Sequence, residues 1–84
     1  MSLWYRNEDF YEKRAGDLQP GDKTEWAVSP NYRGVRTVEE VCRRGGGVVE
    51  VYHLETRRPY HDVFSEDYKV LVLKDGAIGV ESYY

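Results

Sequence analysis

Apolar and polar positions alternate over several short stretches of the chain, as in strands that bury one face. Four stretches show this most clearly, and each is rich in Val or aromatic residues: 24–29, 48–55, 60–64 and 68–73. Clusters of Gly, Pro, Asn and Asp separate them at short intervals. This spacing predicts five or six short strands in an all-β domain.

Residues 35–43 fit the alternation less well, because their valines recur at every third position. A β-bulge near Glu39 and Glu40 would shift the alternation by one residue and restore a strand. Residues 45–47 are all glycine, which suits a tight reversal into the valine-rich segment that follows. We predict a bulged strand followed by a hairpin, and a helix over residues 37–44 is the alternative.

Two turns have a clear chemical basis. Within residues 18–22, Pro20 sets the second position of a type II turn, and Gly21 supplies the positive φ that the third position needs. The first strand should begin after this turn. Asp75 and Gly76 form the dipeptide favoured in primed hairpin turns. We therefore expect residues 77–82 to fold back as a short final strand.

The N-terminal segment, residues 1–16, mixes aromatic and charged side chains. Its spacing fits either a short amphipathic helix or an extended arm with aromatic anchors, and either would cover an edge of the domain. At 84 residues the chain is too short for a second core. We expect this arm or short helix to be followed by a single five- to six-stranded β-barrel domain over 17–84.

The order of these features resembles that of the small Src-homology-3-like β-barrels found in short actinobacterial and bacteriophage proteins. The resemblance spans residues 17–73 and includes the turn at 18–22, the strand at 36–41, the glycine hairpin and the closing strand at 69–73. It implies a binding module instead of an enzyme, and an accessory protein of a phage or mobile element that acts on a host protein. The Ala-Leu-Tyr-type motif of the eukaryotic peptide-binding members has no counterpart here, so recognition of proline-rich ligands is not implied.

Basic groups concentrate in the middle of the chain, although the net charge is −3. Residues 33–58 carry six basic and four acidic groups, and all six basic groups are Arg. The segments on either side are net acidic. Because Arg makes planar, bidentate and stacked contacts that Lys cannot make, this middle stretch is the expected binding surface.

Arginine pairs lie at two predicted turns, and tyrosines are interleaved with them. Tyr, Trp and Arg anchor protein interfaces, which predicts a non-enzymatic protein-interaction module whose partner is a host protein or another subunit of its own kind. Single-stranded nucleic acid is the alternative partner, because aromatic rings stack on bases, but the chain as a whole is acidic. The expected partner-binding residues are Tyr32, Arg33, Arg36, Arg43, Arg44, Tyr52, Arg57, Arg58, Tyr60 and His61.

Few residues have the chemistry needed for catalysis or metal binding. His53 and His61 would approach one another across a hairpin, but a metal site needs three or four converging ligands. Cys42 is the only cysteine, and we expect it to be buried and inert. Adjacent carboxylates such as Glu39 and Glu40 point to opposite faces of a strand. We therefore expect no enzymatic activity, no metal, no cofactor and no small-molecule substrate.

The sequence also predicts where the protein works. No stretch of eighteen apolar residues is present, and the N-terminus lacks the basic and apolar segments of a signal peptide. A single cysteine leaves no disulfide framework. These features predict a cytoplasmic protein without a membrane partner.

Overall fold

The computed structural model describes residues 2–82. These residues form eight strands and two one-turn 3₁₀ helices and contain no α-helix, so the predicted all-β class is confirmed. The elements are β1 (Ser2–Arg6), η1 (Asn7–Asp9), β2 (Phe10–Arg14), η2 (Ala15–Asp17), β3 (Lys23–Val28), β4 (Tyr32–Arg44), β5 (Val48–His53), β6 (Asp62–Ser65), β7 (Lys69–Leu73) and β8 (Val80–Ser82). In this part of the chain, no helix has the length and apolarity needed to cross a membrane.

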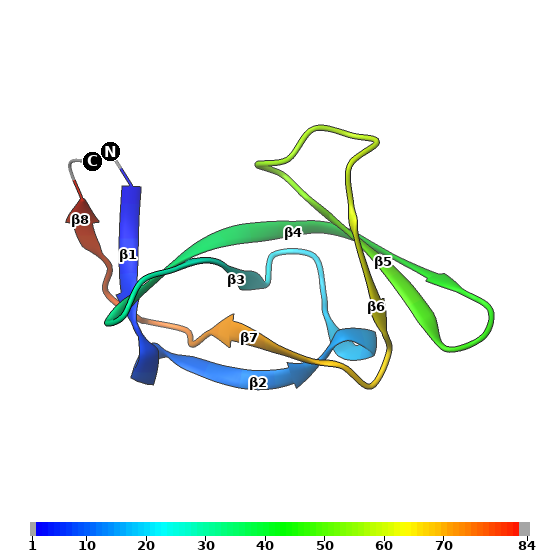
Figure 1. Ribbon diagram of the computed structural model, residues 1–84, viewed down its shortest axis with the longest axis horizontal. Coiled ribbons are helices and arrows are strands. Elements are labelled where there is room, and N and C mark those ends of the chain that lie inside the picture. Colours follow the sequence, from blue (N-terminus) through cyan, green and yellow to red (C-terminus); the bar gives the residue numbers. More distant parts are fainter. Residues whose placement is uncertain (1, 83–84) are drawn as a thin grey trace.

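All eight strands belong to one antiparallel sheet (Figure 1). Six of them follow the order β2-β7-β3-β4-β1-β8, and β5 joins the sheet by pairing with β4 and β6. Among the described strands, β2, β6 and β8 each pair with one neighbour, so the sheet is open. Six of the eight strands, β3 to β8, lie within residues 17–84, in agreement with the five or six expected there. One expectation needs correction: closure of these strands into a barrel is not present in the strand pairing.

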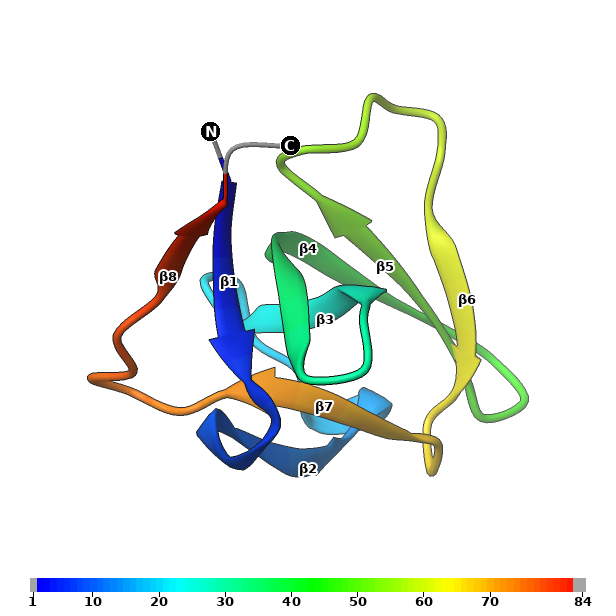
Figure 2. The same ribbon diagram turned by 60° about the vertical axis from the view of Figure 1, so that its left-hand side comes forward.

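The long strand β4, with thirteen residues, connects the two parts of the sheet. Its first half lies between β3 and β1, where Arg36 is opposite Thr24 and Arg33 is opposite Tyr5. Its second half pairs with β5, which in turn pairs with β6. Figure 2 shows the result: β5 and β6 lie on one side of the molecule, and β1 and β8 lie on the other.

A β-bulge interrupts β4 at the predicted place. The register with β5 shifts between Val38 and Glu40, so Glu39 is an extra residue in β4. Val38 belongs to the buried core cluster and Val41 packs against it, although the two are three positions apart. An extra residue in one strand is what lets two such positions face the same side.

Neither segment for which a helix was considered is helical. Residues 37–44 pair with β5 through the turn at 45–47, as the hairpin prediction requires. The described part of the N-terminal segment forms β1 and β2, so the extended alternative is correct there. Tyr5 and Phe10 are buried, and β1 and β2 pair with β4, β7 and β8. Burial of aromatic side chains in long-range pairing outweighs the helical charge spacing.

The turn at residues 18–22 forms as predicted. Gly21 has a φ of 96°, and the N–H of Asp22 donates to the carbonyl of Gln19 at 3.1 Å. The N–H of Gly21 donates to the carbonyl of Val38, and the N–H of Val38 donates to the carbonyl of Asp22, both at 2.8 Å. The turn thus holds the start of β3 against β4 beside the bulge.

The last strand lies elsewhere than predicted. β8 pairs with β1, with Val80 opposite Trp4, and does not fold back on β7. β7 already has β2 on one side and β3 on the other, so it has no free edge for β8. The turn also differs in type, because both primed turns need positive φ at the first central residue. That residue is Asp75, and only glycines such as Gly76 have positive φ in the described chain.

Short aliphatic side chains fill the core between β4, β5 and β7. The buried cluster consists of Ala15, Leu18, Val38, Val49, Val51, Val70 and Val72. On β5 burial alternates strictly from residue to residue. Val49, Val51 and His53 therefore face the core, whereas Glu50 and Tyr52 lie on the outer face of the same strand.

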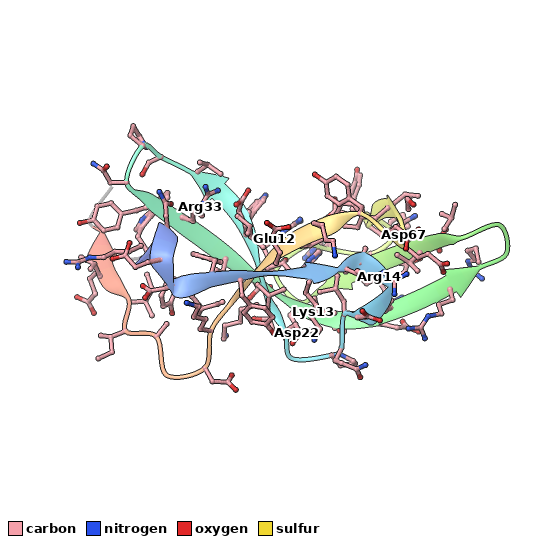
Figure 3. The ribbon with its side chains drawn as sticks, turned by 90° about the horizontal axis from the view of Figure 1, so that it is seen from below. Glu12, Lys13, Arg14, Asp22, Arg33 and Asp67 are labelled. Atoms are coloured by element: carbon pink, nitrogen blue, oxygen red, sulfur yellow. The ribbon has the colours of Figure 1, made fainter. Side chains whose placement is uncertain are left out.

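Charged side chains line the outer strand β2 (Figure 3). Lys13 Nζ donates to Asp22 Oδ2 at 2.8 Å, and Arg14 Nε donates to Asp67 Oδ1 at 3.1 Å. The hydrogen bond to Asp22 raises the pKa of Lys13, which favours the charged form of the ammonium group. Charges on an outer strand discourage pairing with another chain, and β2 is protected in this way.

The substitution Gly21→Ala is expected to lower the free energy of unfolding by about 1–2 kcal/mol, because a left-handed backbone places Cβ too close to the next carbonyl. No atom lies within 4 Å of the added Cβ, so the cost comes from the backbone alone. Gly45→Ala is the matched control, since that Cβ also meets open space and its φ is not positive. Urea denaturation measures both, and equal stability of the two variants would contradict the prediction.

Candidate functional site

A pocket of about 210 Å³ lies between β3 and β6. Its lining is Leu18, Thr24, Glu25, Trp26, Arg36, Val51, His53, Asp62, Phe64 and Val70. Buried apolar residues such as Leu18 and Val51 form its base, whereas Trp26 is 59% exposed at its mouth. We call this the β3–β6 pocket.

Three polar side chains form a connected row along this pocket. Thr24 Oγ1 and His53 Nε2 are 3.0 Å apart and buried, and His53 Nδ1 lies 3.6 Å from Asp62 Oδ2. Thr24 Oγ1 and His53 Nε2 share a hydrogen bond, whereas the contact between His53 Nδ1 and Asp62 is too long for one. Burial, and then the positive charge of Arg36, lowers the pKa of His53. The imidazole is therefore neutral at pH 7.

The order of Thr24, His53 and Asp62 matches nucleophile, base and orienting acid in a hydrolase. Thr24 is only 3% exposed, however, and lies inside the sheet opposite both Arg36 and Val72. Its hydroxyl therefore presents little surface to a substrate, and the contact between His53 and Asp62 is too long for the hydrogen bond that orients a catalytic base. The row is better understood as a buried hydrogen-bond network that fixes β3 to β5.

Arg36 connects the pocket to the loop that follows β5. Its guanidinium donates to Asp62 Oδ2 at 2.6 Å and to Thr56 Oγ1 at 3.0 Å, and it lies 5.1 Å from the ring centre of Trp26. Its Nε is buried without a hydrogen-bond partner. Arg36 was expected on a basic outer surface, but it faces the pocket and its charge is balanced by Asp62.

Sequence reasoning did not find this pocket. Its residues come from segments spread between positions 18 and 70, and no spacing links them. One signal was available. Thr24 and His53 occupy positions on the buried faces of β3 and β5, where a polar side chain needs a buried partner.

A second group of side chains is linked on the opposite, outer face of β5. The Tyr52 ring centre lies 4.9 Å from that of His61 and 4.1 Å from the guanidinium carbon of Arg58. His61 Nε2 is 3.6 Å from Glu50, whose carboxylate pairs with Arg44 at 3.1 Å. We call this group the outer patch, and it consists of Glu39, Glu40, Arg44, Glu50, Tyr52, Arg58 and His61.

The outer patch contains four of the ten predicted binding residues: Arg44, Tyr52, Arg58 and His61. Arg57 and Tyr60 lie exposed in the same loop, and their side chains make no hydrogen bond, ion pair or ring contact within residues 2–82. Tyr60 therefore offers an aromatic side chain to a partner beside the patch, whereas Arg57 has no contact that orders it for binding.

The remaining predicted residues lie elsewhere: Tyr32, Arg33, Arg36 and Arg43. Arg33 pairs with Glu25 near the start of β4. Arg43 donates to the backbone carbonyl of Gly16. It points away from Arg44 because adjacent strand residues face opposite sides. The six middle arginines therefore do not share one surface.

The bulge also corrects the expectation for Glu39 and Glu40. Both carboxylates pair with Arg58, because the extra residue in β4 turns them to the same side. The hydrogen bond from Arg58 lowers the pKa of Glu40.

Cys42 is half-buried on β4 instead of lying in the core. Burial, and then the hydrogen bond with Glu40, raises the pKa of its thiol, which stays protonated at neutral pH.

His53 and His61 do not approach one another as expected. His53 faces the core beside Asp62, whereas His61 lies on the outer patch beside Glu50. No group of three His, Cys, Asp or Glu side chains in residues 2–82 is placed to hold a metal ion.

The lowered pKa of His53 predicts that the protein loses stability as the pH falls below about 6.5, the ordinary pKa of His. In that window the unfolded chain takes up a proton that the folded chain resists, with a slope of up to about 1.4 kcal/mol per pH unit. Urea denaturation between pH 7.5 and about 5 measures this pH dependence of the free energy of unfolding. The interval lies above the range in which carboxylates usually titrate.

His53→Gln is expected to remove this slope, whereas His61→Gln, on the exposed outer patch, should keep it. The pH dependence of stability would belong to another group if it disappeared in the His61→Gln variant or persisted in the His53→Gln variant.

Comparison with known proteins does not place the chain in a family. No protein-family model, curated protein or solved structure matches it.

Proposed function

We propose that this chain is a non-enzymatic protein-interaction module whose outer patch binds a host protein or a second copy of the chain. The observation that carries this proposal is the stacking of Arg58 over Tyr52, with His61 against the same ring. Contacts on both sides order the ring before any partner arrives, so binding costs less side-chain entropy. Tyr60, 71% exposed in the adjacent loop, adds an aromatic side chain that a partner can bury.

The charges of the outer patch favour a protein over single-stranded nucleic acid, the alternative partner. The patch holds two arginines, Arg44 and Arg58, against three carboxylates. Both guanidinium groups already pair with those carboxylates. A phosphate backbone binds by neutralisation with several free basic groups. Beside this patch only Arg57 is unpaired among the basic side chains of the described residues, so the surface is close to neutral instead of basic.

The Src-homology-3-like resemblance of residues 17–73 extends the proposal to an accessory protein of a phage or mobile element acting on a host protein. Strands β4 to β7 of that region share one core, which is compatible with a small binding scaffold of this type. A single cysteine, Cys42, is compatible with work in the cytoplasm.

Affinity purification of the tagged protein, from lysate of the organism that encodes it, tests the proposal. Arg58→Ala is expected to reduce the recovered partner at least tenfold, because interface anchors of this kind carry much of the binding energy. Quantitative mass spectrometry of parallel purifications, with and without nuclease, measures the recovery. Circular dichroism establishes that the variant is folded.

Arg57→Ala is the matched control, because it removes the same charge from the same loop but from a side chain without contacts. Recovery should stay within about twofold of the unmodified protein. An equal loss in both variants, or loss on nuclease treatment, would indicate electrostatic binding of nucleic acid. Unchanged recovery with a folded Arg58 variant would remove the outer patch as the interface.

A further inference from the structure

We propose that the β3–β6 pocket binds one large apolar side chain of an extended peptide, which adds to the sheet as a strand beside β6. This deepens the proposed role in protein interaction, on which it rests. It names the chemistry of a partner segment at a surface separate from the outer patch.

The size of the pocket points to a side chain and not to a cofactor. Its volume of about 210 Å³ falls below the range of roughly 300–1,000 Å³ that is typical of small-molecule sites. It equals the liquid volume of about seven water molecules at roughly 30 Å³ each. A single Leu, Met or Phe side chain is of this scale.

The pocket is apolar at its base and polar towards its mouth, which matches an amino-acid residue with an apolar side chain and a polar backbone. Leu18, Val51 and Val70 at the base are buried and apolar. Glu25, Arg36 and Asp62 make the rest of the lining polar. An apolar side chain suits the base, and the polar peptide backbone on either side of that side chain suits these charged groups.

The strands on both sides of the pocket have unpaired edges. β6 pairs only with β5, and β3 pairs with β7 only at Thr24, which leaves residues 25–28 without a strand on that side. An unpaired edge exposes backbone donors and acceptors in a row, and an extended chain satisfies them. The charged edge of β2 is protected, and β8 is a three-residue strand at the far side of the sheet.

Trp26 forms an aromatic wall of the pocket, and the rest of residues 2–82 leaves this side chain partly exposed. It is 59% exposed, and its ring is held by the guanidinium of Arg36. Trp is among the residues most enriched at binding hot spots. A side chain that enters the pocket would cover it.

Titration of the isotope-labelled protein with pools of acetylated heptapeptides tests this proposal by NMR. The central residue of each pool is fixed as Leu, Phe, Met, Ala, Asp or Lys, and the other positions are random. The Leu, Phe and Met pools are expected to shift the amides of β6 and the indole of Trp26 at concentrations at least tenfold lower than the other three. A Leu pool with N-methylated residues on both sides of the centre should bind at least tenfold more weakly, because it cannot pair as a strand.

Trp26→Ala is expected to remove the response, whereas Val28→Ala should keep it. Val28 is the matched control, since it lies on the same strand with the same 59% exposure but does not line the pocket. Amide spectra without peptide verify that both variants fold.

The proposal would be overturned if no pool shifts the spectrum up to 1 millimolar, if the N-methylated Leu pool binds as tightly as the unmodified Leu pool, or if the Asp and Lys pools give the same response as the Leu pool. Shifts confined to the outer patch would also overturn it while leaving the proposed function intact. A response at the pocket together with failure of the Arg58→Ala test would instead assign the interaction to this pocket.

Discussion

The fold depends on the long strand β4, which must keep its apolar side chains towards the core while its pairing changes from β1 and β3 to β5. Side chains of a regular strand alternate, so Val38 and Val41 cannot both face inward unless one residue leaves the pairing. Glu39 is that residue. Its exclusion turns Glu39 and Glu40 together towards Arg58, while Arg36, two positions before Val38, stays on the inner face. The pocket and the outer patch therefore both arise from one bulge.

The arginines show why segment charge is a poor guide to surface charge. The middle of the chain is its only net basic stretch, yet the structure pairs Arg33 with Glu25, Arg36 with Asp62 and Arg44 with Glu50. Two of these carboxylates come from other segments of the chain. Folding thus converts a basic segment into a set of local ion pairs. The electrostatic potential at the protein surface therefore depends on these ion pairs and not on the order of charges in the sequence.

Much of the turn chemistry was predictable from the sequence, because it depends on neighbouring residues, although the turn at Asp75 and Gly76 differs from the predicted type. The positive φ of Gly21, the reversal at residues 45–47 and the bulge near Glu39 all follow from local rules and were found as expected. Pairing between distant strands was not predictable in this way. No local feature indicates that β8 lies beside β1, or that Asp62 reaches His53. The side on which Arg43 or Arg44 points was not predictable either, since it depends on the register of the hairpin.

The two surfaces are joined by the loop between β5 and β6. Thr56 accepts a hydrogen bond from Arg36 at the pocket, and Arg58, two residues later, stacks on Tyr52 in the outer patch. At the end of the loop, His61 belongs to the patch and Asp62 to the pocket. A shift of this loop would alter contacts on both faces of β5 at once. Because β5 itself is fixed by its pairing with β4 and by buried valines, the loop is the part through which one surface can influence the other.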